Sequence, residues 1–118
     1  MARHNETGKK GEVLAISYLQ QAGFAVLHCN WRHEQYEIDI IATREDILHF
    51  IEVKTRQSLA FGLPEESVSH QKIRNIVTAG VAFQCQYPFW KRVQYDVLSI
   101  MIINQQPAEY LFIEDVYL

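Results

Sequence analysis

The sequence has few cysteines and no long apolar run. Its 118 residues include two cysteines, Cys29 and Cys85, whose spacing fits neither a disulfide framework nor a zinc site, so we interpret both as core thiols. No apolar segment approaches the roughly 20 residues needed to cross a bilayer. A secretory signal has an apolar segment after its basic N-terminus, and this sequence has none there. Together these absences predict a cytoplasmic protein without a membrane partner.

Several catalytic and architectural signatures are also missing. The five histidines show no paired spacing of the kind that binds zinc. No glycine-rich phosphate loop and no nucleophile elbow occurs. Repeats, low-complexity segments and domain linkers are absent, and 48% of the residues are hydrophobic. The sequence therefore predicts a single domain over residues 1–118 with one core.

The chain is slightly acidic, with 11 basic and 14 acidic residues and a net charge of −3. This balance argues against a protein that coats nucleic acid nonspecifically, but it allows a local basic site.

Apolar periodicity predicts seven elements in the order α-β-β-β-α-β-β, a mixed β-sheet flanked by helices of the α/β or α+β class. The first helix is expected over about residues 6–22, with Asn5 or Thr7 as its cap and Gly23 at its end. The second helix is expected from about residue 65 or 67 to 85. Strands are expected over residues 24–29, 36–42, 49–56, 93–103 and 110–118, with a polar connection at 30–35, a loop at 57–64 and a turn at 105–107.

The strands at 36–42 and 49–56 carry apolar residues on both faces, which is typical of the middle of a covered sheet. Four charged residues interrupt them: Glu37, Asp39, Glu52 and Lys54. Because interior charges are costly unless they are paired or hold a metal, these four residues need an explanation.

The register of this hairpin decides which charges meet. A two-residue turn at 45–46 places Asp39 opposite Glu52 and Glu37 opposite Lys54. A shift of one residue would put the two charge pairs on opposite faces of the sheet. A four-residue loop would keep both charge pairs on one face of the sheet but would change which residues lie opposite each other.

In the first register, Glu37 and Lys54 form an ordinary cross-strand ion pair of about 0.2–1 kcal/mol. Asp39 and Glu52 are like charges, and a half-buried pair of this kind needs a proton or a cation. Oxygen ligands suit Mg²⁺, and Lys54 could assist an attacking water or steady charge on a phosphate. The plainer interpretation is a solvated strand face, since Glu-X-Lys also recurs by chance.

Five motifs in order carry a family resemblance. They are GKKGE at 8–12, EIDIIA at 37–42, FIEVKTR at 50–56, Lys72, and YDV at 95–97. On these motifs the chain, from about residue 8 to 100, resembles the uncharacterised bacterial YraN-like family. That family looks like a member of the PD-(D/E)XK nuclease superfamily, close to archaeal Holliday-junction resolvases and to restriction-endonuclease-like folds.

The resemblance implies a site, a cofactor and partners. Glu12, Asp39 and Glu52 would hold Mg²⁺ or Mn²⁺, and Lys54 would join them as the fourth catalytic residue. The weaker candidates for contacts with nucleic acid, most simply DNA, are Lys9, Lys10, Arg56, Lys72 and Arg74. Since many superfamily members act as dimers, the resemblance is also compatible with a homodimer.

The sequence departs from the family pattern at three places. Tyr36 stands where glycine is usual, which would narrow the site. Gln94 replaces a common arginine before the aromatic-Asp pair, which would weaken a phosphate or structural contact. The segment at 113–118 is unlike the family, and we interpret Asp96 as structural.

Three functions from different classes follow. The first is an Mg²⁺-dependent endonuclease that cuts DNA, with branched or repair intermediates as candidate substrates. The second is a nucleic-acid-binding or adaptor protein on a nuclease fold without turnover. The third is a structural module whose charged hairpin is a salt-bridged surface.

Overall fold

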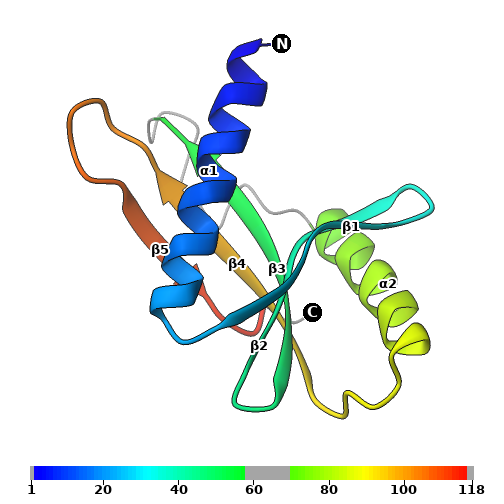
Figure 1. Ribbon diagram of the computed structural model, residues 1–118. Coiled ribbons are helices and arrows are strands. Elements are labelled where there is room, and N and C mark those ends of the chain that lie inside the picture. Colours follow the sequence, from blue (N-terminus) through cyan, green and yellow to red (C-terminus); the bar gives the residue numbers. More distant parts are fainter. Residues whose placement is uncertain (1, 58–69, 117–118) are drawn as a thin grey trace.

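The computed structural model describes residues 2–57 and 70–116, which form two helices and five strands in the predicted order (Figure 1). The elements are α1 (Ala2–Gln21), β1 (Ala25–His33), β2 (Tyr36–Arg44), β3 (Ile47–Arg56), α2 (His70–Gln86), β4 (Val93–Met101) and β5 (Glu109–Ile113). Neither of these helices is long and apolar enough to cross a membrane.

The five strands form one mixed sheet in the order β1-β2-β3-β4-β5. All neighbouring pairs are antiparallel except β3 and β4, which are parallel. A parallel pair needs a crossover connection, and α2 lies in the segment that supplies it. The predicted mixed sheet flanked by helices is confirmed, with β3 at its centre.

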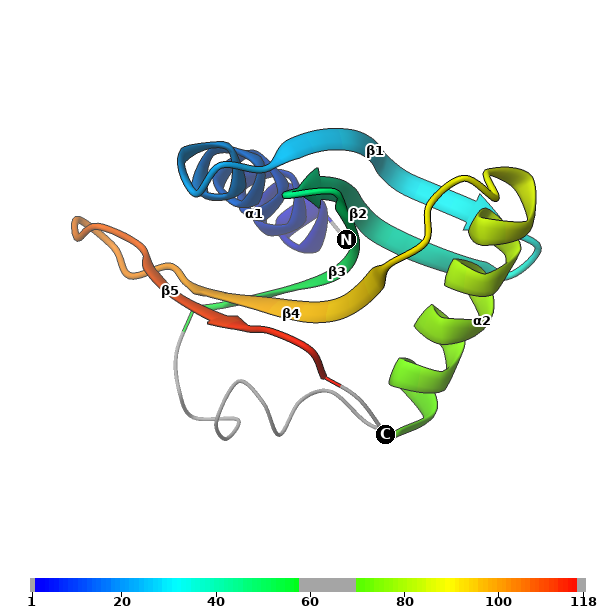
Figure 2. The same ribbon diagram turned by 90° about the horizontal axis from the view of Figure 1, so that it is seen from below.

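The two helices cover opposite faces of the curved sheet (Figure 2). On β3, Ile51 joins a buried cluster with Ala15 and Leu19 of α1, whereas Phe50 joins a second cluster with Phe83 of α2. Successive side chains of a strand point to opposite faces, so a strand with core on both sides is apolar throughout. The predicted central position of this strand is confirmed.

α1 ends where the sequence predicts and begins earlier. Gly23 has a φ of 94° and its N–H bonds to the Gln20 carbonyl, while the Phe24 N–H reaches back to the Leu19 carbonyl. This pair of hydrogen bonds is the Schellman arrangement that a glycine after the helix permits. The expected caps Asn5 and Thr7 are wrong, because the helix continues back past both residues to Ala2.

The polar connection expected at 30–35 is wrong in its first part. β1 continues to His33, and Trp31, Arg32 and His33 pair with β2. β1 is an edge strand, so it carries polar side chains toward solvent without leaving the sheet.

Other boundaries differ modestly. β4 ends at Met101, and β5 ends at Ile113 because Asp115 soon takes a left-handed φ of 59°. Residues 65–69, expected at the start of the second helix, and the loop at 58–64 lie outside the described residues.

The interpretation of the cysteines as core thiols is also wrong. Cys29 and Cys85 are both exposed and neither forms a disulfide. Cys29 lies on the edge strand β1, and Cys85 lies in the last turn of α2.

The hairpin between β2 and β3 closes with the predicted two-residue turn. Glu45 and Asp46 have φ values of 54° and 64°, and Arg44 pairs with Ile47. Two central residues with positive φ define the type I′ turn, whose twist matches that of the strands.

Asn-Gly adopts this turn more readily than Glu-Asp. The double substitution Glu45→Asn with Asp46→Gly is therefore expected to raise the free energy of unfolding by about 0.5–1 kcal/mol, measured by urea denaturation. The matched change Asp46→Ala should lower it, because alanine tolerates a left-handed φ poorly. A double variant less stable than the wild type would contradict the turn assignment.

Candidate functional site

The candidate site lies where β2 and β3 separate. Their backbone pairing runs from Arg44–Ile47 to Ile40–Ile51 and ends there. Asp39 and Glu52 are the next residues in that register, as predicted. Asp39 Oδ2 accepts a 2.8 Å hydrogen bond from the Val53 N–H. Where the backbone hydrogen bonds between β2 and β3 end, a side-chain carboxylate thus accepts the hydrogen bond of a backbone N–H.

Asp39 and Glu52 form the conflicting pair that the register predicted. Burial raises the pKa of Asp39, and the neighbouring charge of Glu52 raises it further, to about 7. The Val53 N–H and the charge of Lys72 act in the opposite direction without cancelling the effect. Near neutral pH this pair therefore favours a shared proton or a bound cation.

Stability without divalent cations is expected to fall as the pH rises from about 4 to about 7. In this window the unfolded chain has released the Asp39 proton, whose ordinary pKa is 3.8, while the folded protein still holds it. The folded state binds more protons, so rising pH favours unfolding, by at most about 1.4 kcal/mol per pH unit from this group.

The measurement is urea unfolding across that pH range in a chelator. Asp39→Asn should remove this part of the slope, whereas Asp46→Asn, at an exposed turn residue, should leave it unchanged. Equal pH profiles for the wild type and Asp39→Asn would contradict the raised pKa.

Two lysines accompany the carboxylates. Glu52 is 8% exposed, and Lys72 Nζ of α2 lies 3.6 Å from its Oε1. Burial and contact with Lys72 lower the pKa of Lys54. Burial alone would also lower the pKa of Lys72, but contact with Lys54 and the charges of Glu52 and Asp39 outweigh it and raise that pKa. Of the two lysines, Lys54 is the one better able to lose its proton.

The predicted pair of Glu37 with Lys54 is wrong. Glu37 Oε2 lies 2.8 Å from Arg32 NH2, and the two residues are partners in the β1–β2 ladder. β2 is no longer paired with β3 at Glu37, so the nearest strand with a cation is β1. The sequence predicts a polar connection at Arg32 instead of a strand, and therefore does not reveal this partner.

Glu12 does not join the other two carboxylates. Its Oε1 accepts a 3.1 Å hydrogen bond from Asn30 Nδ2 on β1. Among the described residues, no set of three metal-ligating side chains that includes Asp39 or Glu52 has its ligand atoms within 4.8 Å of one another. The preceding Gly11 brings α1 against β3, because a Cβ at this position would collide with the Thr55 hydroxyl.

The predicted nucleic-acid contacts are dispersed. Lys9 and Lys10 are exposed on α1, Arg56 is half-buried at the end of β3, and Arg74 is exposed on α2. Of the predicted nucleic-acid contacts, Lys72 is the one for which the described residues show an ion pair with a carboxylate of the site, that of Glu52.

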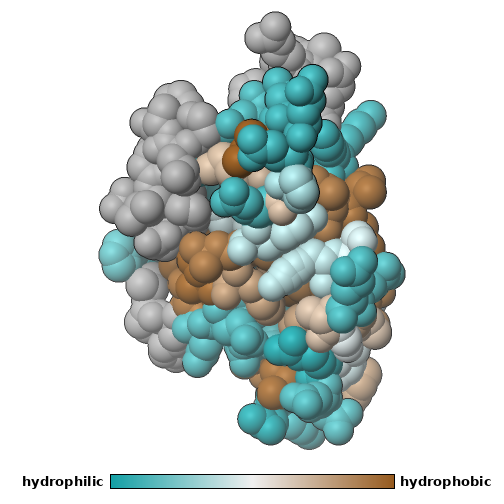
Figure 3. All heavy atoms as spheres, turned by 90° about the vertical axis from the view of Figure 1, so that its left-hand side faces the viewer, coloured by the Kyte–Doolittle hydropathy of each residue, from teal (hydrophilic) through white to brown (hydrophobic). Residues whose placement is uncertain are grey.

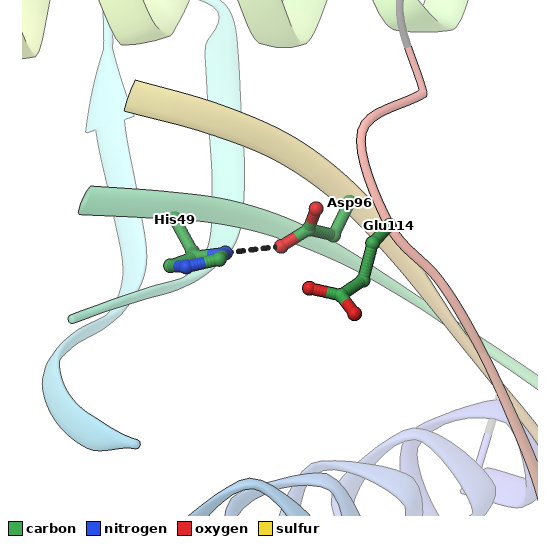
Figure 4. A group of neighbouring side chains, drawn as sticks. All are labelled: His49, Asp96 and Glu114. Atoms are coloured by element: carbon green, nitrogen blue, oxygen red, sulfur yellow. Dashed lines mark hydrogen bonds and ion pairs between the residues drawn. The ribbon is translucent and has the colours of Figure 1, made fainter. Parts of the chain in front are cut away.

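A second polar cluster occupies the α1 face of the sheet and was missed by sequence reasoning (Figure 4). His49 and Asp96 are 2% and 1% exposed, and His49 Nδ1 lies 2.6 Å from Asp96 Oδ2. Glu114 completes a group whose ligand atoms lie within 4.8 Å of one another. The sequence carries one signal of this cluster, a histidine within an otherwise apolar strand, but it does not identify the partner of that histidine.

Hydrogen bonds satisfy this cluster without a metal. Asp96 Oδ1 accepts from Gln94 Nε2 at 3.0 Å and from the Asp115 N–H at 2.9 Å. Glu114 Oε1 accepts from Arg44 at 3.1 Å and from Gln94 at 3.2 Å. The cluster therefore fixes the segment after β5 to the sheet.

Two of the three departures from the family pattern, Gln94 and the segment after Ile113, belong to this polar cluster. Gln94, which stands where arginine is usual, donates a 3.0 Å hydrogen bond to Asp96, so this position makes a structural contact. The atypical segment after Ile113 is tied to the sheet through Asp115, and through a 2.7 Å bond from the Val116 N–H to the Tyr95 carbonyl. Tyr36 is half-buried and packs against the cluster on the α2 side.

An open groove lies elsewhere, between α1 and β5. Its volume is about 510 Å³, and it is lined by Ser17, Tyr18, Gln21, Ala22 and Tyr110. Figure 3 shows apolar surface on this side of the molecule, and Leu111 of β5 is 45% exposed. None of the predicted site residues lines this groove.

Comparison with known proteins places the chain among bacterial relatives. Residues 11–100 match the family described as uncharacterised protein family UPF0102. A UPF0102 protein of Bacteroides thetaiotaomicron is 40% identical over 101 residues, which cover 86% of this chain and 84% of that protein. A UPF0102 protein of Rhodococcus opacus is 42% identical over 103 residues, covering 86% and 87% respectively.

Proposed function

This chain belongs to uncharacterised protein family UPF0102, and from that premise we propose that it is a divalent-cation-dependent nuclease that hydrolyses phosphodiester bonds in DNA. The observation that carries the proposal is the opposed pair Asp39 and Glu52, with Lys54 and Lys72 against it. Perturbed titratable groups of this kind concentrate at functional sites.

The pair fits Mg²⁺ or Mn²⁺. Both ions prefer oxygen ligands, and Mg²⁺ is commonly held by one or two carboxylates together with water and substrate phosphate. Burial and the neighbouring charge of Glu52 raise the pKa of Asp39 to about 7, and a cation held by the two acids would relieve their repulsion. When bound, the ion would supply Lewis acidity toward a phosphate oxygen.

To add a third ligand, the Glu12 carboxylate would have to move closer to Asp39 and Glu52 than it lies in this structure. Its role therefore stays a prediction, and the proposal rests on two carboxylates.

The other side chains position groups and move a proton. The Val53 N–H fixes the orientation of the Asp39 carboxylate. Lys54 has a lowered pKa, which favours a fraction with an unprotonated Nζ able to accept a proton from an attacking water. General base catalysis typically contributes 10²–10⁴-fold, whereas phosphodiester hydrolysis needs on the order of 20 kcal/mol in total. Positioning and electrostatics must provide the remainder.

Binding of DNA would depend on phosphate contacts rather than on base contacts. Lys9, Lys10, Arg56 and Arg74 are the candidates beyond the site itself, and such contacts make affinity strongly dependent on salt. Branched and repair intermediates are the candidate substrates.

A second candidate function follows from the position of Glu12. With only two carboxylates together, the protein would bind nucleic acid, or act as an adaptor, without turnover.

The test is a cleavage assay on linear duplex, branched and single-stranded DNA, with Mg²⁺ or Mn²⁺ and with a chelator. We expect metal-dependent cleavage by the wild type and none by Asp39→Asn, which should remain folded. Activity that persists in Asp39→Asn would indicate a contaminating nuclease. Binding without cleavage of any substrate would favour the second candidate.

A further inference from the structure

Lys72 approaches the carboxylates from α2, whereas the carboxylates belong to the hairpin. Its Nζ lies 3.6 Å from Glu52 Oε1, and its side chain is 42% exposed while that of Glu52 is 9% exposed. Lys72 therefore stands at the rim of the site, between a buried acid and solvent.

With both carboxylates ionised and both lysines protonated, the charges around Lys72 cancel in the absence of a metal ion. Lys72 also contacts Lys54, so two ammonium groups lie beside two carboxylates. Contact between like charges is unfavourable, and the two acids compensate it. With a divalent cation on Asp39 and Glu52, two acids, two lysines and the ion sum to two excess positive charges. Such a site requires an anion, and a phosphodiester supplies one.

We propose that Lys72 is an exchangeable counter-ion that pairs with Glu52 until a divalent cation occupies the carboxylates, and then binds a non-bridging oxygen of the substrate phosphodiester. This inference rests on the proposed function. Its consequence is that cation and nucleic acid bind cooperatively, because each favours the position of Lys72 that the other needs. The coupling is reciprocal, since it is a free energy shared by both ligands.

The test measures binding rather than activity. Mn²⁺ binding is followed by the EPR signal of the free ion without DNA. Affinity for a fluorescent duplex is followed by anisotropy with and without Ca²⁺, which takes the same oxygen ligands. The variants are Lys72→Met and Lys72→Arg, with Arg74→Met as the matched control. Arg74 lies on the same helix, is exposed and donates to Gln71 rather than to the carboxylates.

For Lys72→Met we expect Mn²⁺ affinity to rise about fivefold and DNA affinity in Ca²⁺ to fall about tenfold, so that Ca²⁺ strengthens DNA binding less than in the wild type. Lys72→Arg, which keeps the charge, should recover most of the DNA affinity. Arg74→Met should leave Mn²⁺ binding unchanged and weaken DNA binding equally with and without Ca²⁺.

Two results would overturn the inference while leaving the proposed function intact. One is weaker Mn²⁺ binding by folded Lys72→Met, which would make Lys72 a structural support of Glu52. The other is an effect on DNA affinity no different from that of Arg74→Met. A wild type that neither binds Mn²⁺ nor cleaves DNA would instead overturn the proposed function, and this inference with it.

Discussion

Replacing Lys54 by methionine is expected to lower the rate constant of DNA cleavage by about 10²–10⁴-fold while leaving Mn²⁺ binding in place. Methionine has nearly the length of lysine but no group that can accept or donate a proton. Lys54 interacts electrostatically with Glu52 and Asp39 and is not a metal ligand in the proposed scheme. The loss of activity should therefore fall on the chemical step. Single-turnover cleavage measures that step directly.

Lys91→Met is the matched control for Lys54→Met, because Lys91 is exposed and lies outside the site. A loss below about tenfold for Lys54→Met would contradict its role in proton transfer. Loss of Mn²⁺ binding in parallel would show that Lys54 supports the carboxylates instead. Thermal unfolding of both variants separates these outcomes from loss of structure.

Asp96→Ala is expected to lower the free energy of unfolding by about 3–5 kcal/mol. The substitution removes the acceptor of the His49 Nδ1 and Asp115 N–H hydrogen bonds, and one of the two acceptors of Gln94 Nε2. Of these three residues His49 is buried, and an unsatisfied buried polar group bears the full cost of desolvation. Since small domains are stable by about 5–15 kcal/mol, this single change threatens the fold.

Glu114→Ala is the control for Asp96→Ala, since Glu114 is exposed and its bridge to Arg44 should contribute at most about 1 kcal/mol. Urea denaturation compares the two. The double variant with Asp96→Leu and His49→Leu should be more stable than Asp96→Ala, because an apolar pair of similar volume can replace a buried ionic pair. Equal effects of Asp96→Ala and Glu114→Ala would contradict the account of the cluster.

The hairpin and the family were predictable from local patterns. The apolar runs on both sides of Glu45 and Asp46 made a two-residue turn one of the possible connections, and the observed turn fixes the register as far as Ile40. The motifs at 8–12, 37–42 and 50–56 identified the family, and the relatives confirm it. Each of these signals lies within one or two adjacent elements.

The remaining contacts depend on where elements distant in sequence meet. Lys72 reaches Glu52 only because α2 crosses the sheet on that face. His49 meets Asp96 through the parallel register of β3 and β4, which no short pattern fixes. The error at Glu37 has the same origin, since its partner depended on where β2 leaves β3. The predicted homodimer and cation stay predictions.

The hydrogen bond from Val53 to Asp39 gives the site an internal spectroscopic reporter. The amide proton of Val53 points at a carboxylate instead of a peptide carbonyl, so its chemical shift follows the charge on that carboxylate. Protonation of Asp39 and capture of a cation would each move one backbone resonance. NMR can therefore detect cation binding in the absence of DNA and of turnover. It can thus distinguish cation binding from DNA binding and from cleavage.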